Sequence, residues 1–215
     1  QENQIALILS DVASMPVKAA HDLGIPSILI GNFTWHDIYS HLPGAEKHKH
    51  LLEGPEEEYR CAELHILPQC HLPPLQIGKS KEVGFLAQQG QNIRKDLEQH
   101  LDICFSDKKI IFTYLGEYGT NSVLWENLYQ HKDCLYLTRD PINASVPGLH
   151  ILDSRFDFPD LIASVDVVCT KGGYSTLGSA FANHKPVITC ERHDFYEFKA
   201  IREYLLKTQT GVIIA

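Results

Sequence analysis

The chain has 215 residues, of which 44% are hydrophobic and 21% are charged, and its formal net charge at pH 7 is −8. This composition is that of a globular protein, and its acidic balance without a basic stripe argues against a nucleic-acid-binding protein. No apolar stretch reaches the roughly 18 residues needed to cross a bilayer, and Gln1 opens no signal-peptide pattern. The length allows one large domain or two small ones.

The first part of the chain predicts one βαβ unit. A strand over residues 5–9 is followed by a helix from about Met15 to Leu23 and by a second strand in PSILIGN. The polar stretch from about 36 to 60 can hold a helix, and the proline-rich segment over residues 64–84 predicts a strand that leads into a linker. Because a strand begins almost at Gln1, we expect the chain to be a fragment of a longer protein.

From about residue 91 onward, short apolar runs alternate with helical periodicity, which is typical of a parallel sheet covered by helices on both faces. We expect six strands, in the sequences KIIFTYLGE, CLYLTRD, GLHILDS, DVVCTK, KPVITCE and GVIIA. We expect helices over residues 92–103, 121–131, 157–165, 175–184 and 195–210, the last of them ended by Gly211. The pattern predicts a nearly complete doubly wound domain, preceded by the final part of another such domain.

The six cysteines and twelve histidines do not show metal-ligand spacing. No CxxC pair exists, so a structural zinc site lacks its usual pattern. Cys134, Cys169 and Cys190 lie in or beside predicted strands, as small buried hydrophobic residues of a reducing cytoplasm do. The histidines between His41 and His71 are interpreted as parts of a solvated polar loop, with a metal site as the alternative. We therefore expect a cytoplasmic protein without a metal or a cofactor.

The segment from Lys171 to Thr176 lies between a predicted strand and a predicted helix. Gly172 and Gly173 allow a close approach of the backbone to a ligand, and the free N–H groups at a helix start favour an anion. These features predict a diphosphate site. The alternative is a structural turn in which Ser175 or Thr176 caps the helix. The spacing is not that of a Walker loop, because the lysine precedes the glycines.

The stretch KGGYSTLGSAFANHKPVITCERHDFYEFKAIREYLLKTQTGVII resembles the nucleotide-sugar half of GT-B glycosyltransferases. It is most similar to the glycosyltransferase-like region of L-arabinokinase and, more distantly, to the bacterial peptidoglycan N-acetylglucosaminyltransferase. SDVASMPVKAAHDLGIPSILIGNFTWHDIY resembles the last strand–helix–strand of the first domain of that family, and EVGFLAQQGQNIRKDL resembles its interdomain entry. The resemblance implies a GT-B fold with two Rossmann-like domains, the first of them incomplete. Residues 1–80 would hold the end of the acceptor-side domain plus the linker, and residues 81–215 the donor-binding domain.

The resemblance also implies the roles of individual residues. A nucleotide-diphosphate sugar, in keeping with the UDP-sugar donors of the family, would be the substrate. The donor-binding positions would be Gly116, Ser154, Arg155, Gly172, Gly173, Ser175, Thr176, Ser179, His193, Asp194 and Glu197. The resemblance assigns Ser154 and Arg155 to the loop that faces the base. It assigns His193, Asp194 and Glu197 to the turn that contacts the donor sugar. As alternatives, Glu197 is a first-turn helix acid and His193 a surface residue.

Several residues of the first part are candidates for the acceptor side. Asp11 follows the first strand, where many members carry an Asp that orients a catalytic histidine; we expect that histidine in a segment before Gln1. The alternative is that Asp11 belongs to the N-cap region of the next helix. The stretch NFTWHDIY, which contains Trp35 and His36, follows the second strand and would line an acceptor cleft. Trp35 and Tyr39 would stack on a sugar, or alternatively pack at the domain edge.

Ser179 departs from the pattern of the family. Members carry Glu at this position, where the carboxylate accepts hydrogen bonds from the ribose hydroxyls, and Ser offers only one short hydrogen bond. The predicted function is a metal-independent glycosyltransferase that moves a sugar from a nucleotide-diphosphate donor to an acceptor. The alternatives are a non-catalytic nucleotide- or sugar-binding module and a nucleotide-sugar epimerase or hydrolase of the same fold.

Overall fold

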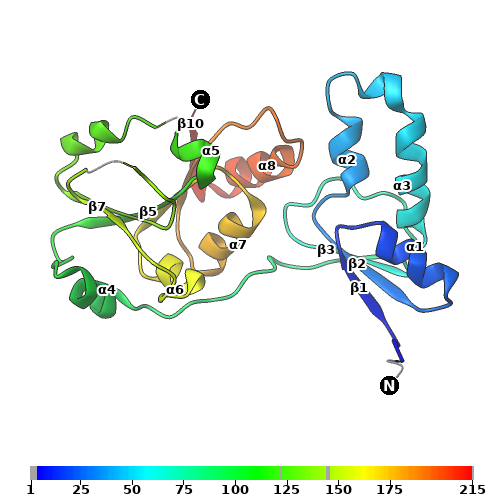
Figure 1. The fold of residues 1–215 in the computed structure, drawn as a ribbon, viewed down its shortest axis with the longest axis horizontal. Helices are drawn as coiled ribbons and strands as arrows, with labels where there is room; N and C mark the ends of the chain where they lie inside the picture. Colours follow the sequence, from blue (N-terminus) through cyan, green and yellow to red (C-terminus); the bar gives the residue numbers. More distant parts are fainter. Residues whose placement is uncertain (1–3, 122, 144–145, 215) are drawn as a thin grey trace. The chain divides into compact units, whose positions relative to one another are not determined.

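The computed structural model describes residues 4–121, 123–143 and 146–214, which form two compact units (Figure 1). The first unit comprises the chain up to Leu86 together with His193–Tyr204, and the second comprises Ala87–Arg192 and the chain from Leu205 onward. These units are defined by contacts, and the predicted division into residues 1–80 and 81–215 stays a prediction.

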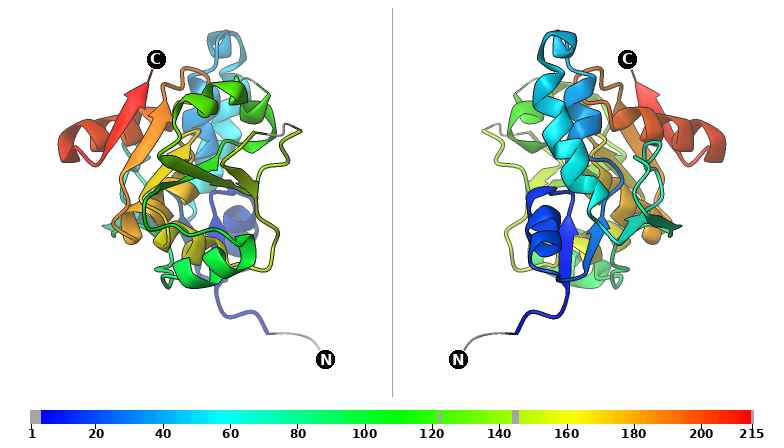
Figure 2. Two further views of the ribbon diagram at one scale, coloured as in Figure 1. Left: turned by 90° about the vertical axis from the view of Figure 1, so that its left-hand side faces the viewer. Right: turned by 90° about the vertical axis from the view of Figure 1, so that its right-hand side faces the viewer.

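The first unit is built on a parallel sheet with the strand order β1-β2-β3-β4. Its strands are β1 (Ile8–Asp11), β2 (Ser27–Ile30), β3 (Leu64–Leu67) and β4 (Lys79–Glu82). Its helices within residues 4–86 are α1 (Met15–Asp22), α2 (Trp35–Ser40), the 3-10 helix η1 (Ala45–His48) and α3 (His50–Arg60). The right-hand view of Figure 2 shows α2 and α3 side by side, in agreement with their contacts.

The core of the first unit forms around Tyr59, whose side chain is fully buried on α3. It packs in one cluster with Val17 of α1 and Leu29 of β2. Burial raises the pKa of the Tyr59 hydroxyl to about 12, so the group stays a donor. It donates to the backbone oxygen of Val12 over 2.6 Å, which satisfies the polar end of an otherwise apolar anchor.

The second unit is built on a parallel sheet with the strand order β10-β9-β8-β5-β6-β7. Its strands are β5 (Lys109–Tyr114), β6 (Cys134–Thr138), β7 (Leu149–Ile151), β8 (Val167–Thr170), β9 (Val187–Cys190) and β10 (Gly211–Ile214). Its helices are α4 (Arg94–Leu101), α5 (Gly116–Thr120), the 3-10 helix η2 (Trp125–Gln130), α6 (Phe158–Ala163) and α7 (Tyr174–Ala182). Helix α8 (Phe198–Thr208) begins in the first unit and ends in the second. The left-hand view of Figure 2 shows β10, β9 and β8 in red, orange and yellow.

The strand order of the second sheet reverses between β5 and β8. The chain runs outward from β5 through β6 to β7, then returns to the other side of β5 and runs outward through β8 to β10. Tyr114 of β5 pairs with Thr170 of β8, so both strands end at the same level. Ligands of open α/β sheets bind at such a reversal, beyond the carboxyl ends of the strands. We therefore expect a ligand-binding crevice beside Tyr114 and Thr170.

Buried apolar side chains form the core of the second unit. Ile110, Phe112 and Leu137 have no exposed surface, and neither do Leu161 of α6 and Leu97 of α4. Full burial of one such side chain contributes about 1.5–3 kcal/mol. This explains why the near-continuous apolar runs of the sequence predicted these strands correctly.

Three elements differ from the sequence-based prediction. The first strand is β1 and not residues 5–9, because pairing with β2 begins at Ile8. Strand β4 lies in the predicted linker and gives no apolar signal, since all its residues are exposed. The predicted helix over 121–131 is reduced to the 3-10 helix η2, where Trp125 is the only buried side chain among those described. One buried anchor gives an α-helix little tertiary support.

The predicted role of Gly211 as a helix end is wrong. Helix α8 ends at Thr208, and Gln209 takes the left-handed conformation with φ +54°. Gly211 is the first residue of β10, and a Cβ atom there would lie 2.4 Å from Val187 Cγ2. Glycine is required at this position because β9 approaches closely, and not because a helix ends there.

The cysteines are less buried than the sequence predicted. Cys134, Cys169 and Cys190 do lie in strands β6, β8 and β9. Cys190, the last residue of β9, is exposed, however, and the other two are half-buried. All six cysteines are free thiols. Among the described residues, no helix has both the length and the apolar character needed to cross a membrane.

Candidate functional site

The loop after β8 leads directly into α7 and has the conformation that an anion site needs. Gly172 has φ +84°, which side-chain-bearing residues rarely adopt. Gly173 is the N-cap of α7 and has extended backbone, with open space where a Cβ atom would lie. The glycine pair therefore leaves the start of the helix uncovered.

The capping role expected of Ser175 or Thr176 is not found. Both residues lie in the first turn of α7, beyond its N-cap Gly173, and no side-chain hydrogen bond caps the helix. Ser175 is exposed and Thr176 is buried. The positive end of the helix dipole is thus not neutralised by a side-chain cap or by an acidic residue in the first turn.

Gly116 begins α5 on the other side of the strand-order reversal, with φ +73°. Its N–H donates to both carboxylate oxygens of Asp140 at 3.1 and 3.2 Å, and the N–H of Leu115 donates to the same carboxylate over 2.6 Å. A Cβ atom on Gly116 would lie 3.1 Å from Lys171 Nζ. The structure therefore brings Gly116, Lys171 and the glycine pair together.

Asp140 and Thr170 are the two residues of this crevice whose importance the sequence did not show. Asp140 is buried at the end of β6 and holds the turn after β5 in place. Thr170 is also buried, and its hydroxyl has no hydrogen-bond partner among the described residues. A buried hydroxyl without a partner is costly unless a ligand or water completes it. No spacing in the sequence predicted the hydrogen bonding of Asp140 or the burial of Thr170.

Ser154 and Arg155 lie in the exposed loop after β7, at the edge of the same sheet. Two strand spacings of about 4.8 Å separate β7 from β5. The Arg155 guanidinium binds Asp153 at 2.8–2.9 Å, and this hydrogen bond lowers the pKa of the Asp153 carboxyl. Arg139 donates to the backbone oxygens of Asp153 and Phe156, which fixes the path of the loop.

The remaining predicted donor residues lie in the first unit by contact. His193 and Asp194 are exposed, whereas Glu197 is buried and accepts a hydrogen bond of 2.7 Å from Asn32 Nδ2. Glu197 precedes α8, which begins at Phe198, so the interpretation as a first-turn helix acid is wrong. Their predicted contact with the donor sugar stays a prediction.

Asp11 ends β1 and is exposed. The N-cap of α1 is Ser14, so Asp11 is not the cap of that helix. The next residue, Val12, has φ +60°, which for a β-branched residue costs of order 1–3 kcal/mol. Its N–H donates to Ile30 over 3.0 Å and its carbonyl accepts from Tyr59, so two hydrogen bonds hold the strained turn. Such strain often marks functional sites, and no sequence signal indicated it.

Trp35 and His36 form the first turn of α2, whose start is a capping box made by Thr34 and Asp37. The Trp35 ring is partly exposed and stacks on Tyr39 with the ring centroids 5.5 Å apart. The Nε2 atom of His36 lies 3.6 Å from a carboxylate oxygen of Glu56, and its buried Nδ1 atom has no hydrogen-bond partner among the described residues.

Ser179 lies half-buried on α7, one turn beyond Thr176. Its carbonyl accepts hydrogen bonds from the backbone and side chain of Asn183. Within residues 4–121, 123–143 and 146–214, no group of three or more His, Cys, Asp or Glu residues could hold a metal ion.

Comparison with known proteins gives one curated relative and many solved structures. No protein-family model matches the chain. L-arabinokinase of Arabidopsis thaliana is 25% identical over 207 residues, a match that covers 95% of this chain and 20% of that protein. A UDP-glucosyltransferase of Polygonum tinctorium superposes with a TM-score of 0.68 at 16% identity, over 99% of this chain and 62% of that one. The glycosyltransferase of kitacinnamycin superposes with a TM-score of 0.66 at 16% identity, over 99% and 64%.

The chain has the GT-B fold. The prediction of this fold, with two parallel-sheet α/β units, is confirmed. The chain spans about a fifth of the length of L-arabinokinase and roughly three fifths of the solved structures named above. At these identities, the likeness to solved structures establishes the fold, and the residues of the crevice carry the argument about chemistry.

Proposed function

We propose that the second unit binds a nucleotide-diphosphate sugar and that the chain serves the transfer of this sugar to an acceptor. The observation that carries this proposal is the uncapped start of α7 behind Gly172 and Gly173, at the point where the strand order reverses. The solved relatives are glycosyltransferases, and one is a UDP-glucosyltransferase, so a UDP-sugar is the first donor to test.

The diphosphate would lie against the start of α7. Backbone N–H groups and the helix dipole stabilise negative charge there, and Lys171 beside Gly116 adds a positive charge. We expect neither a metal nor a cofactor to be required. Ser175 and Thr176 would supply hydroxyl groups, and the loop of Ser154 and Arg155 would face the base. His193, Asp194 and Glu197 would contact the sugar, as the resemblance implies.

Transfer breaks the bond between the anomeric carbon and the diphosphate oxygen, and the acceptor oxygen forms the new bond. Charge accumulates on the leaving diphosphate, and preorganised donors that are aimed at this charge lower the barrier. The acceptor proton passes to a general base. We propose that Asp11 orients this base, supported by its exposed position beside the strained Val12, and that Trp35 and His36 lie on the acceptor side.

Calorimetric titration with nucleoside diphosphates tests the donor site. Gly173→Val should weaken UDP binding at least tenfold without loss of folding, because the Cβ position is open and the backbone is not left-handed. Gly84→Val is the matched control, since its Cβ position is also open. Failure of the unmodified protein to bind any nucleotide or nucleotide sugar would reject the proposal.

A non-catalytic nucleotide-binding module is the second candidate. It is favoured by Ser179 in place of the ribose-binding Glu and by Asp140, whose carboxylate already occupies the Gly116 N–H. Incubation with a panel of nucleotide sugars separates the classes. Binding without products indicates the module, and conversion of the donor without an acceptor indicates an epimerase or hydrolase.

We also propose a cytoplasmic location. The six free cysteines support it, because a reducing compartment preserves free thiols. Fractionation of cells that produce the tagged protein checks this location.

A further inference from the structure

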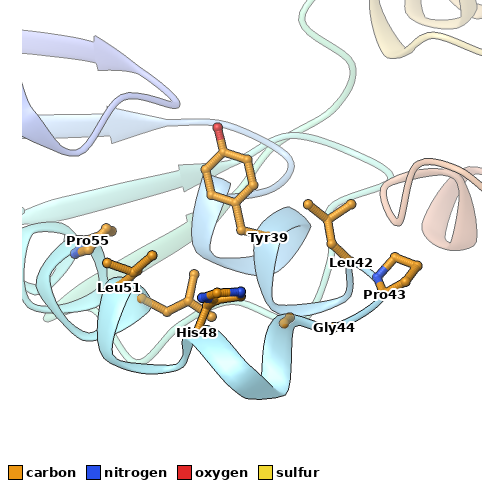
Figure 3. Close-up of a pocket in the computed structure, with 9 residues that line it drawn as sticks. Tyr39, Leu42, Pro43, Gly44, His48, Leu51 and Pro55 are labelled. Atoms are coloured by element: carbon orange, nitrogen blue, oxygen red, sulfur yellow. The ribbon is translucent and has the colours of Figure 1, made fainter.

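A polar pocket lies at the amino ends of strands β5 and β8 in the second unit. Its volume is about 280 Å³, slightly below the roughly 300–1,000 Å³ of pockets that hold drug-sized ligands. The pocket differs in chemistry from the cavity between α2, η1 and α3 of the first unit, whose walls are almost entirely apolar (Figure 3). The charged lining residues of the polar pocket are Arg94, Glu98, Lys108, Lys109 and Asp166, and Phe105 and Ser106 complete the lining.

This pocket is separate from the donor site proposed at the start of α7. Lys109 is the first residue of β5 and Tyr114 is the last. Five steps of about 3.3 Å along the strand place the two residues roughly 17 Å apart. The lining contains none of the predicted donor-binding or acceptor-side residues. The pocket therefore has a chemistry of its own to explain.

Both carboxylates of the lining already accept hydrogen bonds from the protein. Asp166 accepts from Arg94 Nη2 over 2.7 Å and from the N–H of Ile110 over 2.8 Å. Glu98 accepts from the N–H of Phe105 over 2.6 Å. Burial acts to raise the pKa of the Asp166 carboxyl, but the hydrogen bonds from Ile110 and Arg94 lower it below its usual range. The two acids thus hold α4 and the strand ends in place.

The lysines of the pocket are not compensated in this way. Lys109 is exposed, and its ammonium group has no hydrogen bond or ion pair with any residue that the structure describes. The ammonium group of Lys108 donates to the backbone oxygen of Lys132, a neutral acceptor that leaves the positive charge unbalanced. Two positive charges at the start of β5 are therefore available to a ligand.

A further cation lies next to the pocket. Lys185 comes just before β9, which pairs with β8, so it lies near Asp166 at the amino end of the neighbouring strand. Burial lowers the pKa of its ammonium group, the charge of Arg94 lowers it further, and the charge of Asp166 opposes the shift. Within the described part of the chain, the ammonium group has no hydrogen bond or ion pair. The region thus has more cations than carboxylates, although the net charge of the chain is −8.

We propose that this pocket binds a small phosphate-type anion, either inorganic phosphate or the phosphate group of a small metabolite. Ammonium and guanidinium groups form charge-assisted hydrogen bonds with phosphate oxygens, and the hydroxyl of Ser106 can add a neutral one. The volume leaves room for a short carbon chain beside the phosphate group. The proposal goes beyond the function proposed above and does not depend on it, because the two sites share no residue.

The test titrates the full chain with inorganic phosphate and, separately, with glycerol 3-phosphate, while NMR follows the backbone amide signals. Saturable shifts are expected at residues 105–109. They should persist in Gly173→Val, which disables the other proposed anion site, whereas shifts at residues 172–174 would report on that site alone. Tighter binding of glycerol 3-phosphate would identify a phosphorylated metabolite as the ligand class, and tighter binding of inorganic phosphate would identify the free ion.

Charge variants test the pocket itself. Lys109→Gln should weaken phosphate binding about fivefold to tenfold, because an uncompensated cation is lost. Lys95→Gln is the matched control, since it removes the same charge from an exposed position of α4 outside the lining. It should change the affinity less than about twofold, because solvent screens that charge. Lys185→Gln should also weaken binding and replaces Lys109→Gln if that variant does not fold.

Glu98→Gln should have the opposite effect. It removes a negative charge from the lining and keeps an oxygen that can accept from the N–H of Phe105, so phosphate binding should tighten about threefold. The absence of saturable shifts at residues 105–109 with both probes would overturn the proposal. Equal weakening in Lys109→Gln and Lys95→Gln would also overturn it, because the attraction would then come from the overall charge and not from the pocket.

Discussion

The two units carry parallel sheets of different topology. The second sheet grows in both directions from β5, whereas the four strands of the first sheet follow one another in a single direction. Only the second sheet has a strand-order reversal, between β5 and β8, and ligands of open α/β sheets bind at such a reversal. In the first unit a cavity lies instead between α2, η1 and α3. Strand order thus shapes the candidate site of one unit, and helix packing shapes the cavity of the other.

Four experiments test this contrast between the two units. The largest effect is expected from the two cores. Leu29 of β2 and Leu137 of β6 have no exposed surface. Leu29→Ala and Leu137→Ala should each lower the free energy of unfolding by about 2–5 kcal/mol, because truncation leaves a cavity. Chemical denaturation measures this loss. Leu9→Ala, at a residue that is 62% exposed, should change the stability by no more than about 0.5 kcal/mol.

Equal losses of unfolding free energy in Leu29→Ala and Leu137→Ala would show that the cores of both units pack equally well. The two sheets would then differ in strand order alone. A loss at Leu29 below about 1 kcal/mol would mean that the first unit has a loose core. The contrast would then be one of packing and not of strand order.

The next effect concerns Asp140, which prepares the crevice of the second unit. Asp140→Ala should cost about 2–3 kcal/mol, because the N–H groups of Leu115 and Gly116 lose their acceptor. Asp140→Asn keeps one carbonyl oxygen and should cost less. Amide hydrogen exchange at Leu115 and Gly116 should accelerate in the alanine variant, and unchanged exchange at both would show that the carboxylate does not hold this turn.

A smaller effect is expected from a substitution at Ser179 that should increase the affinity for UDP. If α7 binds a nucleotide, Ser179→Glu should tighten UDP binding about tenfold, or about 1.4 kcal/mol, because a carboxylate can accept two hydrogen bonds from the ribose. Ser179→Ala is the control and should change the affinity less than about twofold. Calorimetry decides between the two outcomes, and an unchanged affinity in Ser179→Glu would indicate that the ribose lies elsewhere.

The smallest effect is the pH dependence that His65 gives to the first unit. His65 lies buried on β3, and burial lowers the pKa of its imidazole. The Gly31 backbone opposes this shift weakly, and neither ring nitrogen has a hydrogen bond of normal geometry among the described residues. The nearby titratable groups are His71, which lowers the pKa further, and Asp37, which raises it.

Because the folded state holds His65 neutral, the unfolded chain binds a proton first as the pH falls below about 6.5. The stability of the first unit should therefore fall between pH 6.5 and the lower pKa of the folded state, and level off below it. His65→Leu should flatten this slope in urea titrations at several pH values. His50→Leu, at an exposed histidine, should keep the slope, and a slope that is the same in both variants would exclude His65 as its source.

Much of the fold was predictable because local patterns and burial agreed. The apolar runs of β5, β6, β8 and β9 each contain buried residues and lie inside the six-stranded sheet, so composition alone indicated them. Strand β4 was not predictable, because its exposed polar residues join the sheet only through backbone pairing with β3. Gly211 was misinterpreted for a related reason, since its close neighbour Val187 is distant in sequence.

Local sequence patterns were enough to establish the alternation of strands and helices, the glycine pair before α7 and the resemblance to GT-B glycosyltransferases. These are local properties, set by side-chain periodicity and by the backbone freedom of glycine. Three features became visible only in the folded chain: Asp140 holds the turn at Gly116, the buried Thr170 hydroxyl has no partner among the described residues, and a cavity opens between α2 and α3. Hydrogen bonds and cavities depend on which distant segments meet, and strand order and helix packing determine those meetings.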